Sequence, residues 1–304
     1  MRYFDAHNHL QDEALSPHLP RILDDLVSLG ITAAVVNGTL DRDWPAVSLL
    51  ARSHPWIIPS YGIHPWYTSQ RAPDWQHQLN TRLDQGGVIG EIGLDRWKPG
   101  FDIHDQTRLF RAQLQIAAER NLPATIHCLR AWGPLWDILR ADPVPDCGFL
   151  LHAYGGPVEM LPGFITRGAY FSFNASFLAH DRPRKLDPFR EIPLDRLLVE
   201  TDAPSMPLPP EFDKHPLPDT PAGDKANNPA NITVAYAALA NLRQIEVEAL
   251  ARQVEQNFNR LFGNVSKAVP LARSPGRPGR TKLQPPIWKC LKGRPRWPGG
   301  PARN

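Results

Sequence analysis

Residues 88–127 read VIGEIGLDRWKPGFDIHDQTRLFRAQLQIAAERNLPATIH and hold a complete β/α unit. The segments 88–92 and 124–127 are short and almost wholly apolar, which is typical of strands buried on both faces of a parallel sheet. Between them, residues 105–120 place small and apolar side chains at helical spacing, namely Leu109, Ala112, Ile116 and Ala117. The stretch therefore predicts two parallel strands joined by a crossover helix.

The same alternation extends over the first 200 residues or so of the chain. Further strands are predicted at 3–6, 33–37, 57–62, 149–152, 170–173 and 197–201. Further helices are predicted between them at 19–29, 45–53, 75–85, 133–140, 158–166 and 184–191. Eight strands alternating with helices predict an α/β fold, a TIM-like (β/α)8 barrel in regular or distorted form. An open doubly wound sheet is the alternative.

Two extra C-terminal helices are predicted at 230–242 and 245–261. Asn231 is the expected N-cap of the first, and Gly263 is expected to end the second as a C′ glycine. The barrel domain is therefore assigned to residues 1–263. The remaining 264–304 form a basic tail, and residues 265–304 contain eight prolines and five glycines without a hydrophobic period. This composition predicts disorder.

Charge divides along the same boundary. The formal net charge of the 304 residues is +3, but residues 265–304 hold ten of the 34 Lys and Arg and none of the 31 Asp and Glu. The rest of the chain has 24 basic against 31 acidic residues, a net charge of −7. The barrel is thus acidic, and with 42% hydrophobic residues the chain can bury a large core.

The chain shows no sign of export. Its start, MRYFDAHNHL, lacks the pattern of a signal peptide, and no apolar run approaches the roughly 20 residues of a membrane span. The three cysteines are widely spaced, which excludes a disulfide scaffold and a CxxC motif. These features predict a cytoplasmic protein without membrane contact.

Asp5-Ala6-His7-Asn8-His9 carries the sharpest chemical signal, at the end of the first strand. Alternate residues of a strand point to the same side, so His7 and His9 can converge inside the mouth of the barrel. Imidazole is the commonest protein ligand of transition metals. Two surface histidines at a strand end are the alternative.

Four more residues of metal-ligand type stand where an apolar strand gives way to a loop: Glu91, His127, His152 and Asp202. In a barrel all these strand ends lie on one rim. Four histidines and two carboxylates suit two divalent ions that share a bridging group, and the mixed donors fit Zn, Mg or Mn in different degrees. A metal-activated water would then be the nucleophile at neutral pH.

Taken together and in order, the motifs resemble those of the TatD family of metal-dependent, deoxyribonuclease-like hydrolases in the amidohydrolase superfamily. The pieces are DAHNHL (5–10), YGIHPW (61–66), GEIGLD (90–95), ATIHC (124–128), HAYGG (152–156) and ETDAP (200–204). NNPANI (227–232) and NFNRLFG (257–263) resemble the closing segment of the family. The resemblance covers residues 1–263 and implies the TIM-like barrel.

The resemblance also implies roles for the six residues. His7, His9 and Asp202 would hold one ion, His127 and His152 the other, and Glu91 would bridge both. Glu91 and Asp202 are the expected catalytic residues, with Asp202 as the proton acceptor from the attacking water.

Substrate contacts are expected around this rim. The resemblance makes His64 a contact to substrate or phosphate, with a structural histidine before Pro65 as the alternative. Arg96, Lys98 and Arg130 follow barrel strands and are placed to meet an anion, although solvated rim charges look the same. Trp66 and Trp97 could stack a base or pack under a loop.

The resulting functional prediction is a phosphodiesterase or deoxyribonuclease that acts on DNA. The alternatives are hydrolysis of a small amide, lactone or ester and, in another class, a non-catalytic metal-containing binding protein. The acidic barrel is unlike the basic groove expected for DNA, but bound metal ions offset that locally. The tail is a second region that could contact nucleic acid, with a dispensable extension as the alternative. No obligate protein partner is predicted.

Overall fold

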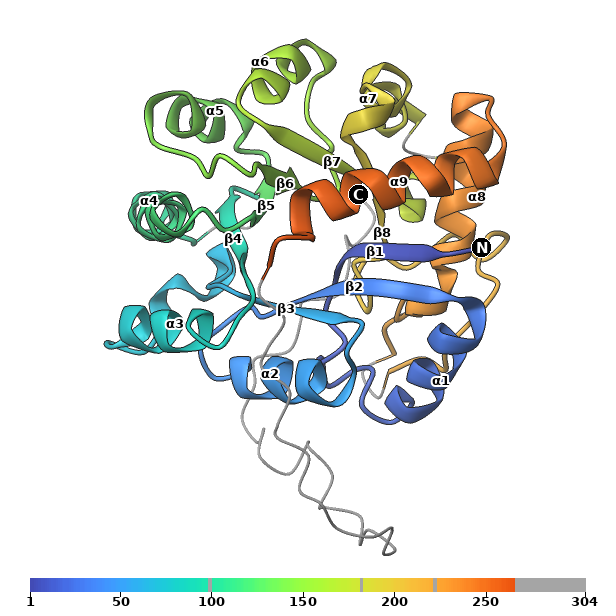
Figure 1. Ribbon diagram of the computed structural model, residues 1–304, viewed down its shortest axis with the longest axis horizontal. Coiled ribbons are helices and arrows are strands. Elements are labelled where there is room, and N and C mark those ends of the chain that lie inside the picture. Colours follow the sequence, from blue (N-terminus) through green and yellow to red (C-terminus); the bar gives the residue numbers. More distant parts are fainter. Residues whose placement is uncertain (98–99, 181–182, 221–222, 266–304) are drawn as a thin grey trace, which may run out of the picture.

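Eight parallel strands form one sheet in sequence order, β1 to β8, in the computed structural model, which describes residues 1–97, 100–180, 183–220 and 223–265 (Figure 1). Every neighbouring pair from β1·β2 to β7·β8 is parallel. The strands are β1 (Tyr3–Asn8), β2 (Ile31–Asn37), β3 (Ile57–Tyr61), β4 (Val88–Asp95), β5 (Ala124–Leu129), β6 (Phe149–Leu151), β7 (Ala169–Asn174) and β8 (Leu197–Glu200).

The sheet closes between its first and last strands. The backbone N–H of Asp202 donates to the carbonyl of His7 at 2.9 Å, and that of His9 donates to the carbonyl of Ala203 at 2.8 Å. In an open doubly wound sheet the edge strands do not meet, so that alternative is wrong. The predicted TIM-like barrel is confirmed.

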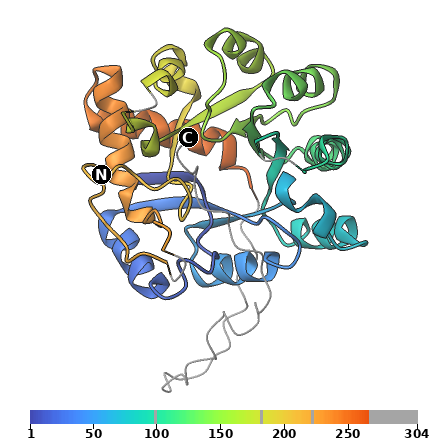
Figure 2. The same cartoon turned by 180° about the vertical axis from the view of Figure 1, so that it is seen from behind.

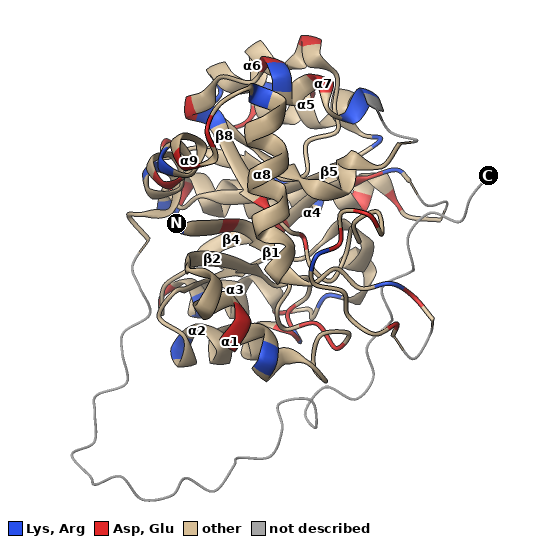
Figure 3. Ribbon diagram, turned by 90° about the vertical axis from the view of Figure 1, so that its right-hand side faces the viewer, with Lys and Arg blue, Asp and Glu red and all other residues tan. Residues whose placement is uncertain are grey.

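Helices surround the barrel on the outside (Figure 1). They are α1 (Leu19–Leu29), α2 (Trp44–Ser53), α3 (Trp75–Leu83), α4 (Ile103–Arg120), α5 (Trp132–Ala141), α6 (Leu161–Thr166) and α7 (Asp187–Glu191). Short 3-10 turns link the elements: η1 (Pro65–Gln70), η2 (Val158–Met160), η3 (Ala175–Leu178), η4 (Pro183–Lys185), η5 (Leu194–Arg196) and η6 (Pro229–Asn231). Lys, Arg, Asp and Glu residues occur mainly in the helices and loops (Figure 3).

Two predicted helices are shorter than the sequence pattern indicated. The segment 158–166 begins as the 3-10 turn η2, and α6 starts only at Leu161. The segment 184–191 likewise contains η4 before α7 starts at Asp187. Both helices carry a proline in their first turn, Pro162 and Pro188. Proline is tolerated there but not in a helix interior, so each helix begins immediately before it.

The two predicted C-terminal helices are present as α8 (Ile232–Arg243) and α9 (Val247–Phe262). Helix α9 crosses one end of the barrel (Figure 1). Its Phe258 packs against Phe4 at the start of β1 with ring centroids 5.0 Å apart. Its Asn257 amide donates to the carbonyls of Leu194 at 2.7 Å and Leu197 at 2.8 Å, beside the start of β8. Helix α9 therefore closes the amino-terminal end of the barrel, and the mouth lies at the opposite end.

The predicted caps of these helices differ from what the structure shows. Asn231 stands at the N-cap position of α8, but its side chain makes no capping bond. Instead its Oδ1 accepts from the N–H groups of Lys214 at 3.1 Å and His215 at 3.2 Å, so it fastens the preceding loop. Gly263 follows α9 with φ −68°, in the right-handed region, and is not a left-handed C′ glycine. The predicted tail from residue 266 onward lies outside the described residues.

None of the helices in the described part of the chain combines the length and the apolar character needed to cross a membrane.

Candidate functional site

Six side chains meet at the mouth of the barrel, which Figure 2 shows from the end opposite to Figure 1. We call them the polar cluster: His7, His9, Glu91, His127, His152 and Asp202. Three of them lie in β1, β4 and β5, two directly follow β1 and β6, and Asp202 is the second residue after β8. All are buried except His127, whose side chain is 15% exposed. The structure thus brings together the six residues that were predicted as metal ligands.

One half of the polar cluster, the first donor group, consists of His7, His9, Asp202 and the Oε2 atom of Glu91. The two Nε2 atoms of His7 and His9 are 3.3 Å apart. Glu91 Oε2 lies 3.5 Å from the first of these nitrogens and 3.3 Å from the second, and Asp202 Oδ1 lies 3.6 and 3.4 Å from them. Neighbouring ligands on a tetrahedral ion with bonds of about 2.1 Å stand about 3.4 Å apart, so these spacings fit one divalent cation.

The other half, the second donor group, consists of His127, His152 and the Oε1 atom of Glu91. Glu91 Oε1 lies 3.0 Å from His127 Nδ1 and 2.9 Å from His152 Nε2. The two nitrogens are 3.2 Å apart. Three donors at this spacing can all reach a common point at about 2.1 Å. The two oxygens of one buried carboxylate therefore face two different sets of imidazole nitrogens.

Two buried oxygens test whether the cluster fits a cation. Glu91 Oε2 and Asp202 Oδ1 have no hydrogen-bond partner among the described residues, although both are shielded from solvent. Leaving a buried carboxylate oxygen unsatisfied is costly. A positive ion between the carboxylates and the imidazole lone pairs would remove that cost, because carboxylate oxygens and imidazole nitrogens are common donors to metal ions. The donors therefore fit a divalent cation.

Two glycines let Glu91 reach this position. A Cβ atom on Gly90 would lie 1.8 Å from the Thr125 hydroxyl oxygen, and one on Gly93 would lie 2.0 Å from the His127 carbonyl oxygen. Both glycines also have positive φ, 155° and 148°. Only glycine combines this backbone conformation with so close an approach of β4 to β5. The glycines of the GEIG motif are thus required for the close packing of β4 against β5 on both sides of the Glu91 carboxylate.

The buried carboxylate of Asp5 in β1 holds Asp202 in place. Asp5 accepts hydrogen bonds from the Thr201 hydroxyl at 2.7 Å and from the backbone N–H groups of Thr201 at 3.2 Å and His7 at 3.1 Å. Asp202 itself has φ 52°, a left-handed conformation that is uncommon for residues other than glycine. Such strain persists only where the surroundings enforce it, and here Asp5 ties the end of β8 to β1.

A backbone contact sets the tautomer of His9. His9 Nδ1 lies 2.7 Å from the carbonyl oxygen of Asn37, which can only accept a hydrogen bond. The proton therefore sits on Nδ1, and the lone pair of Nε2 faces the first donor group.

Burial and charge shift the pKa values in the cluster in opposite directions. Burial lowers the pKa of His7 to about 3. Burial also disfavours charge on His9, but the carboxylates of Asp202 and Glu91 outweigh it and raise its pKa to about 10. Burial likewise opposes ionisation of Glu91, but the imidazoles of His64, His152 and His7 hold the pKa of this carboxyl well below its usual range. The buried carboxylates thus favour positive charge among the imidazoles, which is the charge that a bound cation would supply.

His64 lies inside this arrangement and not at an exposed rim. Its side chain is 0% exposed, and its Nε2 lies 3.4 Å from Glu91 Oε1. Its Nδ1 accepts from the N–H of Trp66 at 3.1 Å, and its ring centroid is 4.5 Å from that of His127. The expected rim position is wrong, because the loop after β3 folds inward over the strand ends. A contact between His64 and substrate stays a prediction.

The predicted cationic contacts lie at one corner of the mouth. Arg96 and Arg130 are exposed and follow the paired ends of β4 and β5, where Arg96 N–H donates to the Leu129 carbonyl at 2.9 Å. Beside them Trp66 and Trp97 form an aromatic wall with ring centroids 6.2 Å apart. Lys98 lies outside the described residues. Contact of any of these residues with substrate stays a prediction.

The sequence analysis missed two further buried carboxylates around the cluster. Glu200 is fully buried with Oε1 at 3.6 Å from His152 Nδ1, and it accepts from the Asn174 amide at 3.4 Å and from the Ser172 hydroxyl. Asp95 lies 3.0 Å from His127 Nε2. The sequence feature that could have revealed them is an acidic residue at the end of an apolar strand, namely Asp95 in GEIGLD and Glu200 in ETDAP.

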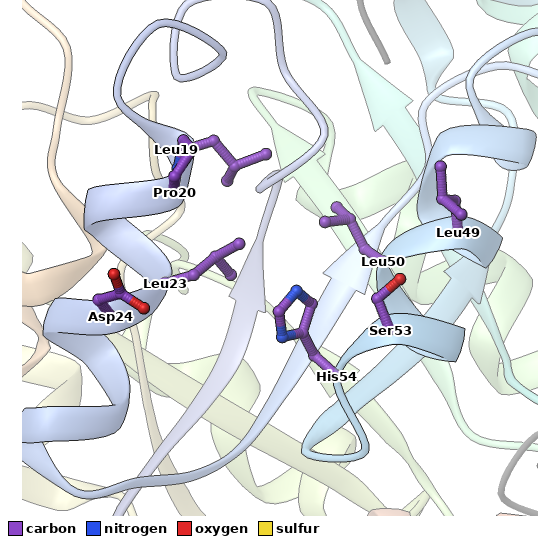
Figure 4. A pocket seen from close by; sticks show the side chains of 8 residues that line it. All are labelled: Leu19, Pro20, Leu23, Asp24, Leu49, Leu50, Ser53 and His54. Atoms are coloured by element: carbon purple, nitrogen blue, oxygen red, sulfur yellow. The ribbon is translucent and has the colours of Figure 1, made fainter. Parts of the chain in front are cut away.

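A pocket of about 340 Å³ lies elsewhere, between α1 and α2. Its lining is mostly apolar, and Leu23 and Leu50 point into it from the two helices (Figure 4). It shares no residue with the polar cluster and offers no comparable set of ligands.

The chain is similar in sequence to a known protein family and to several of its members. A sequence model of the family described as TatD related DNase matches residues 4–263. The chain is 32% identical over 263 residues to the uncharacterized metal-dependent hydrolase YcfH of Escherichia coli K12, covering 85% of this chain and 94% of that protein. It is 30% identical over 251 residues to the 3'-5' ssDNA/RNA exonuclease TatD of Citrobacter koseri, covering 79% and 92%.

Solved structures agree with the fold. The crystal structure of YJJV, a TatD homolog from Escherichia coli K12, superposes with a TM-score of 0.77 at 24% sequence identity, covering 86% of this chain and 98% of that one. A TatD family hydrolase from Entamoeba histolytica superposes with a TM-score of 0.75 at 18% identity, over 86% and 98% of the two chains. At these identities the likeness supports the barrel itself.

Proposed function

This chain belongs to the TatD-related DNase family, and on that premise we propose that it hydrolyses phosphodiester bonds of nucleic acid with two divalent ions held in the polar cluster. The chain is a metal-dependent hydrolase, as the sequence predicted. The observation that carries the proposal of two ions is the orientation of Glu91, whose Oε1 and Oε2 face separate donor groups. Nucleic acid as substrate is supported by the relative named as an exonuclease on single-stranded DNA and RNA.

Each donor group has a defined part in this proposal. His7, His9 and Asp202 would hold one ion, His127 and His152 the other, and Glu91 would bridge them. Two such ions would supply Lewis acidity toward the phosphate oxygens and generate a nucleophile from water at neutral pH. Zn, Mg and Mn all accept mixed nitrogen and oxygen donors to some degree.

Asp202 is the proposed proton acceptor. Its Oδ1 atom faces the first donor group and has no hydrogen-bond partner among the described residues. An unsatisfied carboxylate oxygen beside the attacking water could take the proton that the water loses. The hydrogen bonds through Asp5 and Thr201 keep the backbone of Asp202 in place for this step.

The proposed substrate contacts lie at the corner beside the second donor group. Arg96 and Arg130 would meet the phosphates, since guanidinium groups bind phosphate with two parallel hydrogen bonds. Trp66 and Trp97 would stack an unpaired base, which favours single strands over duplex. His64 would approach the scissile phosphate from inside the cluster. Hydrolysis of a small amide, lactone or ester, and a non-catalytic binding role, are not favoured by the relatives.

A substrate panel with and without chelator tests the proposal. The purified protein, reloaded separately with Zn²⁺, Mg²⁺ or Mn²⁺, is assayed on single-stranded DNA, single-stranded RNA, duplex DNA, a chromogenic phosphodiester and a set of lactones and amides. We expect turnover of the single strands, loss of activity with EDTA, and recovery on adding metal back. Metal content measured by elemental analysis should approach two ions for each chain. Turnover confined to lactones or amides, or activity that survives chelation, would contradict the proposal.

We also propose that residues 264–304 add non-specific affinity for nucleic acid. The ten basic residues of 265–304, with Trp288 and Trp297 among them, suit phosphate contact and stacking. A chain truncated after Gly263 should bind single-stranded DNA more weakly at low salt and show a shallower dependence of affinity on salt, because fewer counterions are released. Equal affinity of the full and truncated chains at low salt would reject this role.

A further inference from the structure

Asp95, the last residue of β4, joins a ligand of the second donor group to the aromatic wall at the mouth. Its Oδ2 atom lies 3.0 Å from His127 Nε2 and accepts from the Trp66 indole N–H at 2.8 Å. The side chain of Asp95 is 0% exposed, so both contacts are made away from water. A buried contact of this kind is stronger than the same contact at the surface.

The surroundings of Asp95 leave its carboxylate little freedom. Its Oδ1 atom accepts from the Trp97 N–H at 2.6 Å. Its backbone is held on both sides by the Gln106 amide of α4, which accepts from the Asp95 N–H at 2.8 Å and donates to the Asp95 carbonyl at 3.0 Å. The Trp97 contact orients the carboxylate and the Gln106 contacts hold the end of β4, so Oδ2 stays directed at His127.

The Asp95 contact determines which nitrogen of His127 faces the second donor group. An ionised carboxylate can only accept a hydrogen bond, so His127 Nε2 must carry a proton. The lone pair of Nδ1 then points toward Glu91 Oε1 at 3.0 Å and His152 Nε2 at 3.2 Å. His7, His9 and His152 all present Nε2 to the cluster, whereas His127 presents Nδ1. The buried Asp95 faces Nε2 of His127, whereas the buried Glu200 faces Nδ1 of His152, so each of these rings turns to the cluster the nitrogen opposite its carboxylate.

We propose that Asp95 is a positioning residue that sets the tautomer and ring orientation of His127 and so determines the cation affinity of the second donor group. The inference rests on the proposed pair of ions and extends it to a residue outside the ligand set. Partners of metal-bound histidines commonly act in this way, and their loss lowers metal affinity by roughly 10–100-fold. The Trp66 contact also ties the aromatic wall to the same carboxylate.

The Asp95→Asn variant distinguishes this role from one in which Asp95 only holds the end of β4 in place. In the wild type Oδ2 faces both His127 Nε2 and the Trp66 indole, while Oδ1 accepts from the Trp97 N–H. If the side-chain oxygen of Asn stays on the Trp97 N–H, its amide group takes the place of Oδ2, loses the Trp66 contact and donates to His127 Nε2, which makes that nitrogen an acceptor and moves the proton to Nδ1. Calorimetric titration of the chelator-stripped full chain with Zn²⁺, and separately with Mn²⁺, then reports two binding steps. We expect one step to weaken by roughly 10–100-fold and the other to stay within about threefold.

Two further variants control the experiment. Trp66→Phe removes the indole donor but leaves the Asp95–His127 contact, so both cation steps should remain near those of the wild type. His127→Ala should weaken the same step as Asp95→Asn, and the double variant should be no weaker than His127→Ala alone, since Asp95 acts through that ring. Thermal unfolding of the stripped variants shows whether the barrel itself is intact.

Three results would overturn the inference: unchanged cation binding in Asp95→Asn, equal weakening of both steps, or additive effects of Asp95→Asn and His127→Ala. None of these measurements uses a substrate. A wild-type chain that binds two cations and hydrolyses no nucleic acid would therefore sink the proposed function and leave the role of Asp95 standing. Conversely, nuclease activity of the wild-type chain together with unchanged cation binding in Asp95→Asn would support the proposed function and reject the role of Asp95.

Discussion

Replacing Glu91 with glutamine is expected to lower kcat/KM on single-stranded DNA on the order of 10³-fold or more, with the barrel still folded. Glu91 faces both donor groups, with Oε1 at 2.9 Å from His152 Nε2 and Oε2 at 3.3 Å from His9 Nε2. Glutamine keeps the shape but removes the negative charge that two cations would share. Loss of a single preorganised electrostatic contact already costs about 10²–10³ in rate, and here the loss affects both ions.

The measurement is kcat/KM of Glu91→Gln at saturating metal, paired with elemental analysis of the dialysed protein and a far-UV circular dichroism spectrum. Glu119→Gln is the matched control, since Glu119 is an exposed glutamate on α4 whose partner is Gln115 on the same helix. We expect the control to retain wild-type activity and metal content. If the Glu91→Gln protein binds two ions and reacts at the wild-type rate, Glu91 does not have the proposed bridging role.

Replacing Asp202 with asparagine is expected to lower kcat by about 10²–10⁴-fold, the range found for removing a positioned general base. Asparagine retains an oxygen that can contact a cation but cannot accept a proton from water. We therefore expect kcat to fall far more than the metal content does. Asp202→Ala removes both capacities and should lose metal at the first donor group as well, where Asp202 Oδ1 lies 3.4 Å from His9 Nε2.

The pair of Asp202 variants is compared by single-turnover kinetics and by metal content at equal free metal. Asp137→Asn, a change at an exposed aspartate on α5, serves as control and should leave both quantities unchanged. If Asp202→Asn turns over at the wild-type rate, the proton acceptor is another group. If the two variants lose metal equally and recover equally at high metal concentration, Asp202 acts as a ligand alone.

The strands could be predicted because hydrophobic runs between turns are a local property. All eight predicted strands are present, and the two helices after them also follow their apolar spacing. The prediction for β4 ended at residue 92, whereas the strand continues to Asp95. Gly93 weakens a strand pattern in sequence, but in the barrel its missing Cβ lets the chain pass against the His127 carbonyl. That contact joins residues far apart in the chain and leaves no local signal.

The misplaced features share one cause. Asn231 has the chemistry of a helix cap, but the loop residues Lys214 and His215 compete for its oxygen. His64 has the chemistry of a rim residue, but its loop turns inward to Glu91. In both cases the side chain could act locally along the chain, but it contacts a group that only the folded structure brings near.

From the amino-acid sequence alone one obtains the eight-fold β/α repeat, the boundary between an acidic barrel and a basic tail, and the six residues with metal-ligand chemistry at strand ends. These follow from periodicity, composition and residue type, each of which is local along the chain. The tertiary structure decided how the donors divide into two groups around the oxygens of Glu91, which nitrogen each imidazole presents, and that Asp95 and Glu200 stand behind two of them. Such choices depend on distances of about 3 Å between residues on different strands, and only closure of the barrel sets those distances.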